Sequence, residues 1–80
     1  MTVFYAKDAV KSINRLDAPT RQRIRQAVNG IPRGDIKPLQ GTSDTFRLRV
    51  GDWRILFSYP DDDTILVERV APRGDVYKGV

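Results

Sequence analysis

The residues of this sequence that could do chemistry are arginines, and three of them surround one short turn. Arg47 and Arg49 alternate with apolar residues before Gly51-Asp52, and Arg54 follows that turn. The guanidinium group is a planar fork of N–H donors that matches the oxygens of a phosphate group. It stays protonated at physiological pH, so it stabilises negative charge but accepts no proton. The pattern therefore favours binding of a phosphodiester or another polyanion.

The composition excludes several other kinds of chemistry. The 80 residues include no Cys and no His, which rules out disulfides, thiolate metal sites and the His-containing catalytic triads and zinc motifs. Lys and Arg number 14 against 10 Asp and Glu, giving a net charge of +4. This balance suits a polyanionic partner, either a nucleic acid or an acidic protein.

The positive surplus and the arginines around the turn lie in different halves of the chain. Residues 1–44 hold eight Lys and Arg against four Asp, whereas residues 45–80 hold six of each sign. The surplus comes mainly from Arg21, Arg23 and Arg25, whose ordinary interpretation is a solvated face of a helix. Net charge therefore indicates a class of partner and does not locate a site.

The first half of the chain has the patterns of a short strand and two helices. Residues 3–5 form an apolar run typical of an edge strand, and apolar residues then recur at helical spacing over residues 7–16. Asp17 and Pro19 end this helix and begin a second one, which Gly30 and Pro32 end. A joint of five residues between them predicts an antiparallel helical hairpin.

The second half switches to a period of two, which is typical of strands. Residues 32–44 predict a loop, with a possible short strand at 36–39. Alternation over residues 46–50 and 53–59, a turn at 60–63 and an apolar run at 64–70 predict an antiparallel meander. We expect a single α+β domain over residues 1–80, with helices covering one face of the sheet.

A two-residue turn at Gly51-Asp52 predicts the register of the first hairpin. It places Arg49 directly opposite Arg54, and Arg47 opposite Leu56, on one face. The other face carries the apolar pairs Phe46–Phe57, Leu48–Ile55 and Val50–Trp53. Directly opposed like charges are destabilising, which favours a functional cradle for a phosphodiester over a solvated face covered by long side chains.

Two registers of the second hairpin are compatible with the sequence. The simplest pairing joins Tyr59 to Thr64 and Arg54 to Arg69, but it places Glu68 on the apolar face. The alternative is a β-bulge in this strand that moves Glu68 or Arg69 out of the simplest register. Beyond this strand, we expect Arg73 to make a further phosphate contact. We expect Tyr77 to provide a ring on which a base could stack.

Three segments together resemble the RelE branch of the RelE/ParE toxins of bacterial toxin–antitoxin pairs. They are the arginine hairpin over residues 46–57, the ending over residues 67–77 and the lead-in over residues 35–41. The resemblance covers nearly the whole chain and implies an α+β fold. In that fold, a two-helix N-terminal hairpin packs on a curved, mainly antiparallel sheet of about four strands.

The resemblance also implies an activity. RelE-like toxins inhibit translation by cutting mRNA in the ribosomal A site, without a metal or other cofactor, and a cognate antitoxin silences them. The ribose 2′-OH attacks the adjacent phosphate and yields a 2′,3′-cyclic phosphate and a free 5′-OH. The family's catalytic positions correspond to Arg49, Arg54, Arg73 and Tyr77. Arg47, Lys37 and Arg69 are assigned to substrate binding.

The sequence departs from the family at the positions of Arg47 and Arg49, which are lysines in the best-known members. One of those lysines is assigned general-base character, a role for which a guanidinium is a poor candidate. Tyr77, Glu68 and Asp75 are the remaining candidate bases. We therefore expect electrostatic stabilisation to dominate, with Arg49 and Arg54 on the phosphate and Arg73 on the leaving oxygen. Arg47 would support them, and Tyr77 would orient or stack on the base.

Two other functions remain possible from the sequence. One is a ParE-like inhibitor of DNA gyrase on the same scaffold, which the missing base favours and the arginines at nuclease positions disfavour. The other is a basic RNA- or DNA-binding module, which predicts salt-sensitive binding and no toxicity. The expected partners are an antitoxin, the ribosome with its mRNA, and operator DNA through the antitoxin complex. We expect no signal peptide, no membrane association and a cytoplasmic location.

Overall fold

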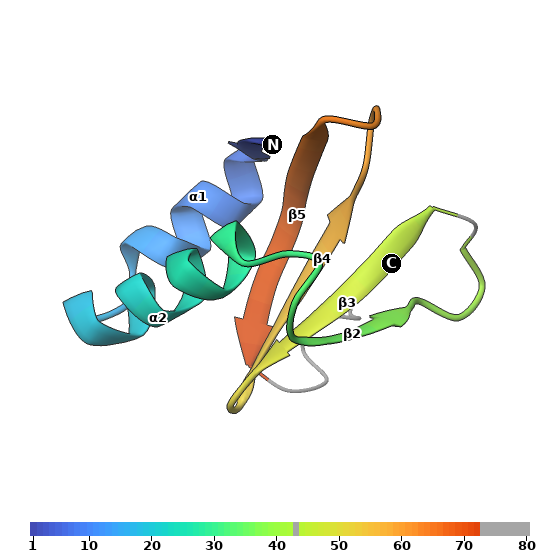
Figure 1. Cartoon of the computed structure of the whole chain (residues 1–80). Helices are drawn as coiled ribbons and strands as arrows, with labels where there is room; N and C mark the ends of the chain where they lie inside the picture. Colours follow the sequence, from blue (N-terminus) through green and yellow to red (C-terminus); the bar gives the residue numbers. More distant parts are fainter. Residues whose placement is uncertain (43, 73–80) are drawn as a thin grey trace.

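The computed structural model describes residues 1–42 and 44–72 of the chain (Figure 1). Its elements in chain order are β1 (Thr2–Tyr5), α1 (Lys7–Asn14), α2 (Ala18–Asn29), β2 (Asp35–Pro38), β3 (Thr45–Val50), β4 (Trp53–Ser58) and β5 (Thr64–Pro72). The order of helices followed by a meander is that predicted from the two hydrophobic periods.

The described strands form one mixed sheet of five strands, in the order β1-β5-β4-β3-β2. β1 runs parallel to β5, and the other three pairings are antiparallel. The expectation of about four strands was therefore wrong. The additional strand is β2, which includes most of the segment left open at 36–39 and pairs with β3.

The joint between the two helices is shorter than expected. α1 ends at Asn14, and residues 15–17 alone separate it from α2. The backbone N–H groups of Arg15 and Leu16 bond to carbonyls three residues earlier, which tightens the end of α1. Asp17 caps α2, since its Oδ2 accepts a hydrogen bond from the Thr20 N–H at 3.3 Å. A hydrogen bond from the Thr20 side chain, together with this one from its backbone, lowers the pKa of the Asp17 carboxyl below its usual range.

The helices cover one side of the sheet (Figure 1). Ala9 and Ile13 of α1 and Ile24 and Val28 of α2 are buried in one cluster with residues of β3, β4 and β5. The sheet residues of this core are Leu48, Ile55, Phe57, Ile65, Val67 and Val70. The core therefore takes alternate residues of the strands and leaves the intervening side chains on the opposite face. Among the described helices, none is long and apolar enough to cross a membrane.

The pairing of β4 with β5 contains a β-bulge, which the sequence analysis had given as the alternative to the simplest register. Phe57 lies opposite Val67 and Leu56 lies opposite Arg69, so Glu68 is an extra residue in β5. The simplest register, with Arg54 opposite Arg69, was wrong, because Arg54 pairs with Ala71. The extra residue shifts the alternation by one, so that Val67 and Val70 both face the core although they are three residues apart.

Deletion of Glu68 is expected to preserve the fold. Without this residue Val67, Arg69 and Val70 form a regular strand in which every described pair with β4 is kept. We expect a free energy of unfolding within about 1 kcal/mol of the wild type, measured by chemical denaturation.

Deletion of Leu56 is the matched control, since this residue is paired on both sides. Its loss moves every following residue of β4 to the opposite face, so the variant should not fold. Unfolding of the Glu68 deletion variant to the same extent would contradict this account of the bulge.

Candidate functional site

The first hairpin has the register predicted from its turn. Arg49 lies opposite Arg54 and Arg47 opposite Leu56. Gly51 has a φ of 58°, a left-handed conformation that glycine adopts without steric cost. Because Leu48, Ile55 and their neighbours fill the core, the arginines lie on the face turned away from the helices.

Five cationic residues on four adjacent strands share that face, which is called the basic face below. The register places Lys37 of β2 opposite Arg47 of β3, Arg49 opposite Arg54 of β4, and Leu56 opposite Arg69 of β5. The basic face therefore comprises Lys37, Arg47, Arg49, Arg54 and Arg69.

Arg49 and Arg54 occupy different environments although they are opposed. Arg54 is half-buried, and its Nη1 donates hydrogen bonds to the carbonyl oxygens of Gly51 at 2.9 Å and Trp53 at 3.1 Å. Arg49 is exposed, and within the described residues it makes neither a side-chain hydrogen bond nor an ion pair. One guanidinium is thus held against the turn, while the other is available for a ligand.

Arg47 is held by an ion pair that the sequence analysis did not foresee. Its Nη2 lies 3.3 Å from Oδ1 of Asp35 on β2, and only 13% of the Arg47 side chain is exposed. The spacing of Asp35 and Lys37 could have indicated it. Because these residues are two positions apart, a strand there places both side chains on the face of Arg47. Asp35 orients the guanidinium and offsets part of the charge of the basic face.

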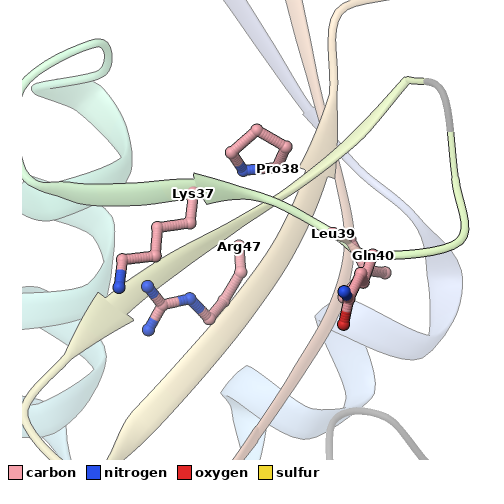
Figure 2. A pocket seen from close by; sticks show the side chains of 5 residues that line it. All are labelled: Lys37, Pro38, Leu39, Gln40 and Arg47. Atoms are coloured by element: carbon pink, nitrogen blue, oxygen red, sulfur yellow. The ribbon is translucent and has the colours of Figure 1, made fainter.

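A hollow of about 390 Å³ lies beside this ion pair. It is lined by Lys37, Pro38, Leu39, Gln40 and Arg47. Figure 2 shows the side chains of Lys37 and Arg47 extending next to each other from neighbouring strands. Two cationic groups therefore border a recess whose lining also includes the Gln40 amide and the apolar side chains of Pro38 and Leu39.

Arg69 lies in the same cross-strand row as Arg47, separated from it by Leu56. Leu56 is only 3% exposed although it lies on the face opposite the core. Glu68, a candidate base, is the half-buried extra residue of the bulge. Arg69 therefore belongs to the row of Arg47 and not, as the simplest register implied, to that of Arg54.

Three residues named from the sequence lie outside the described residues: Arg73, Tyr77 and the alternative base Asp75. In residues 1–42 and 44–72, no group of three or more acidic residues gathers where it could hold a metal ion. A second hollow, of about 410 Å³, lies over α2 and away from the basic face. It is lined by Ala18, Arg21, Gln22 and Arg25.

Comparison with known proteins agrees with this architecture. The family model for the ParE toxin of type II toxin–antitoxin systems, parDE, matches residues 3–77. The chain belongs to the RelE/ParE toxins. The resemblance inferred from the arginine hairpin and the C-terminal segment is thereby confirmed.

Individual relatives of this RelE/ParE toxin are RelE proteins. Toxin RelE3 of Methanocaldococcus jannaschii is 31% identical, with 96% of each chain covered. The RelB–RelE antitoxin–toxin complex of Methanococcus jannaschii matches with a TM-score of 0.75 and 28% identity, over 92% of this chain and 94% of that one. The toxin–antitoxin complex RelBE2 of Mycobacterium tuberculosis has a TM-score of 0.75 and 26% identity, covering 90% and 96%. The chain is therefore a RelE-like toxin of a toxin–antitoxin system.

The basic face of this RelE-like toxin can bind and neutralise a phosphate group. Within the described residues it combines an exposed guanidinium at Arg49, a fixed one at Arg54 and a recess bordered by Lys37 and Arg47. Guanidinium groups aimed at a phosphate stabilise charge that develops on its oxygens. Because an arginine cannot accept a proton, these groups are suited to electrostatic stabilisation and not to the role of a general base.

Proposed function

We propose that this toxin is a ribosome-dependent endoribonuclease that inhibits translation by cutting mRNA without a metal ion. The observation that carries the proposal is the opposition of Arg49 and Arg54 next to a recess bordered by Lys37 and Arg47. Placing like charges opposite each other costs stability, and a bound phosphate would offset that cost. The kinship with RelE toxins supports the same activity.

In the proposed reaction, the ribose 2′-OH attacks the adjacent phosphorus atom. A bond forms between the 2′ oxygen and phosphorus, and the bond from phosphorus to the 5′ oxygen breaks. The 2′-OH proton passes to a general base, and the 5′ oxygen takes a proton from a general acid. The products are a 2′,3′-cyclic phosphate and a 5′-OH, so no water or cofactor is consumed.

The residues of the basic face receive distinct roles in this reaction. Arg49 and Arg54 stabilise the charge of the pentacovalent phosphorane, with Arg47 in support. Lys37 and Arg69 bind the flanking RNA. The recess of about 390 Å³ beside Lys37 would receive a nucleotide of the substrate.

The C-terminal segment supplies the remaining roles. We assign Arg73 to the leaving 5′ oxygen and Tyr77 to orienting or stacking on the base. The general base is one of Tyr77, Glu68 and Asp75.

A cognate antitoxin is the proposed protein partner. Several solved relatives are RelB–RelE complexes, and this toxin would likewise be silenced by a bound antitoxin. Its charge predicts an acidic, amphipathic helical segment as the contact, lying over the helices or over the basic face. A small neighbouring open reading frame encoding such a chain would supply this partner, and the complex could bind operator DNA.

Expression in growing cells, followed by mapping of mRNA 5′ ends, tests the proposed activity. We expect growth arrest with new 5′ ends that are phased to codons, and 5′-OH termini at the cut sites. Growth arrest with intact mRNA would contradict the proposal, and accumulated gyrase–DNA cleavage complexes would then support the ParE-like alternative.

A further inference from the structure

The side chain of Arg23 on α2 reaches the turn between β3 and β4. The helical pattern of the sequence does not predict this contact. A Cβ atom added to Gly51 would lie 3.1 Å from Nη2 of Arg23. On the same turn, Nη1 of Arg54 donates to the Gly51 carbonyl at 2.9 Å. Two guanidinium groups from separate elements therefore meet at one exposed turn, and glycine leaves the space that Arg23 occupies.

The positive charge at this turn is not neutralised by the described part of the chain. Arg23 is exposed and, like Arg49, makes no side-chain hydrogen bond or ion pair within the described residues. Asp52 belongs to the turn itself, yet it forms no ion pair with Arg23, Arg49 or Arg54 in this part of the structure. The tip of the hairpin thus gathers the side chains of Arg23, Arg49 and Arg54, none of which forms an ion pair with a carboxylate of residues 1–42 or 44–72.

We propose that Arg23 and the tip of the β3–β4 hairpin bind a backbone phosphate of RNA that flanks the scissile one. Arg54 of the basic face bonds to the Gly51 carbonyl of this turn, and Arg23 reaches the same turn from the helix side. An RNA strand that leaves the basic face around the hairpin tip would therefore meet Arg23. The choice of RNA as the ligand rests on the proposed function. The guanidinium fork of Arg23 would hold the strand in place and take no part in bond making or breaking.

The neighbouring arginines of α2 do not share this position. Successive residues of a helix are rotated by about 100°, so Arg25 lies roughly 200° around the helix from Arg23. Arg25 lines the separate hollow over α2, and its charge opposes the rise in the pKa of Tyr5 that burial causes. Arg25→Gln therefore removes the same charge from the same helix at a place away from the hairpin tip.

The test measures binding of a fluorescent single-stranded RNA whose riboses are 2′-O-methylated, so that it cannot be cut. Anisotropy titrations between about 50 and 200 mM KCl yield the slope of log K against log salt, which reports the number of phosphates contacted. We expect Arg23→Gln to reduce this slope by about 0.7, the value for one phosphate contact on a single strand. Arg25→Gln should keep the wild-type slope.

A second variant moves Arg23 without changing the net charge. Gly51→Asn introduces a residue that tolerates positive φ and crowds the guanidinium, so it should also reduce the slope. If circular dichroism shows that Arg23→Gln does not fold, the Gly51→Asn variant is used to test the proposal in its place. Equal slopes for Arg23→Gln and Arg25→Gln would show a bulk charge effect and overturn the proposal. A wild-type slope in both Arg23→Gln and Gly51→Asn would overturn it as well.

Polyglutamate serves as a probe for an acidic protein partner. If Arg23→Gln weakens polyglutamate binding and leaves the RNA slope intact, the site takes carboxylates and the RNA proposal is wrong. Because the methylated RNA is not cleaved, the slope is independent of the mapping of mRNA ends in cells. Failure of the proposed nuclease activity and failure of the Arg23 contact are therefore separate results.

Discussion

Arg49→Gln is expected to abolish growth arrest by this toxin without lowering its stability. Removing one donor to a developing negative charge typically slows a reaction by about 10²–10³-fold, and we expect mRNA cleavage to slow by that factor. Arg49 is exposed and makes no side-chain hydrogen bond or ion pair among the described residues, so the substitution breaks neither kind of bond. Its charge is opposed by Arg54 on β4 and attracted by Asp35, which lies opposite it on β2, so the free energy of unfolding should change by less than about 0.5 kcal/mol.

Two further variants make the Arg49 experiment specific. Arg15→Gln removes the same charge from an exposed position after α1 and should leave growth arrest intact. Arg49→Lys keeps a cation where the best-known relatives have lysine, and it should retain most of the cleavage. Growth assays, mapped 5′ ends and chemical denaturation provide the readouts. Wild-type cleavage by Arg49→Gln would remove Arg49 from the proposed site.

Phe57→Ala is expected to remove a large share of the protein's stability. Phe57 is fully buried, and its ring lies 5.7 Å from that of Phe46 and 5.5 Å from that of Tyr59. Truncating a buried Phe costs about 3–5 kcal/mol. At about 0.05–0.15 kcal/mol per residue, the whole chain is stabilised by roughly 4–12 kcal/mol. The variant should therefore lose a large share of this stability and, with it, part of its toxicity.

Thermal unfolding followed by circular dichroism checks the Phe57 prediction. For a domain of this size, 1 kcal/mol corresponds to about 4–8 °C in Tm, so we expect a fall of more than about 10 °C. Phe57→Leu retains a branched apolar side chain and should unfold at an intermediate temperature. A Tm for Phe57→Ala close to that of the wild type would show that the core does not depend on this ring.

The first hairpin was predictable because its information is local. Gly51 adopts the positive φ that a two-residue turn needs, and the alternation on each side then leaves one register that buries the apolar residues. The opposition of Arg49 and Arg54 follows from that register alone. The same reasoning predicted the second strand pair less well, because the longer turn after Tyr59 does not specify a register.

The position of the bulge at Glu68 could not be predicted from local sequence, because it depends on the packing of the whole sheet. A carboxylate on the apolar face is costly, which showed that the simple register was doubtful without showing where the chain would adjust. The bulge lies where Val67 and Val70 can both reach the core. Its position depends on how β5 packs against the helices while it pairs with β4, which no local pattern contains.

By itself, the sequence determined the two helices, the three longer strands and the hairpin that carries the paired arginines. Each of these depends on residue type and on spacing over a few positions. Only the tertiary structure decided which distant charges meet: Asp35 with Arg47 across two strands, and Arg23 with the turn at Gly51. The physical reason is that long charged side chains reach several ångströms from their backbone. Their partners are chosen by how the helices and strands pack, after the periodicity has placed them on a face.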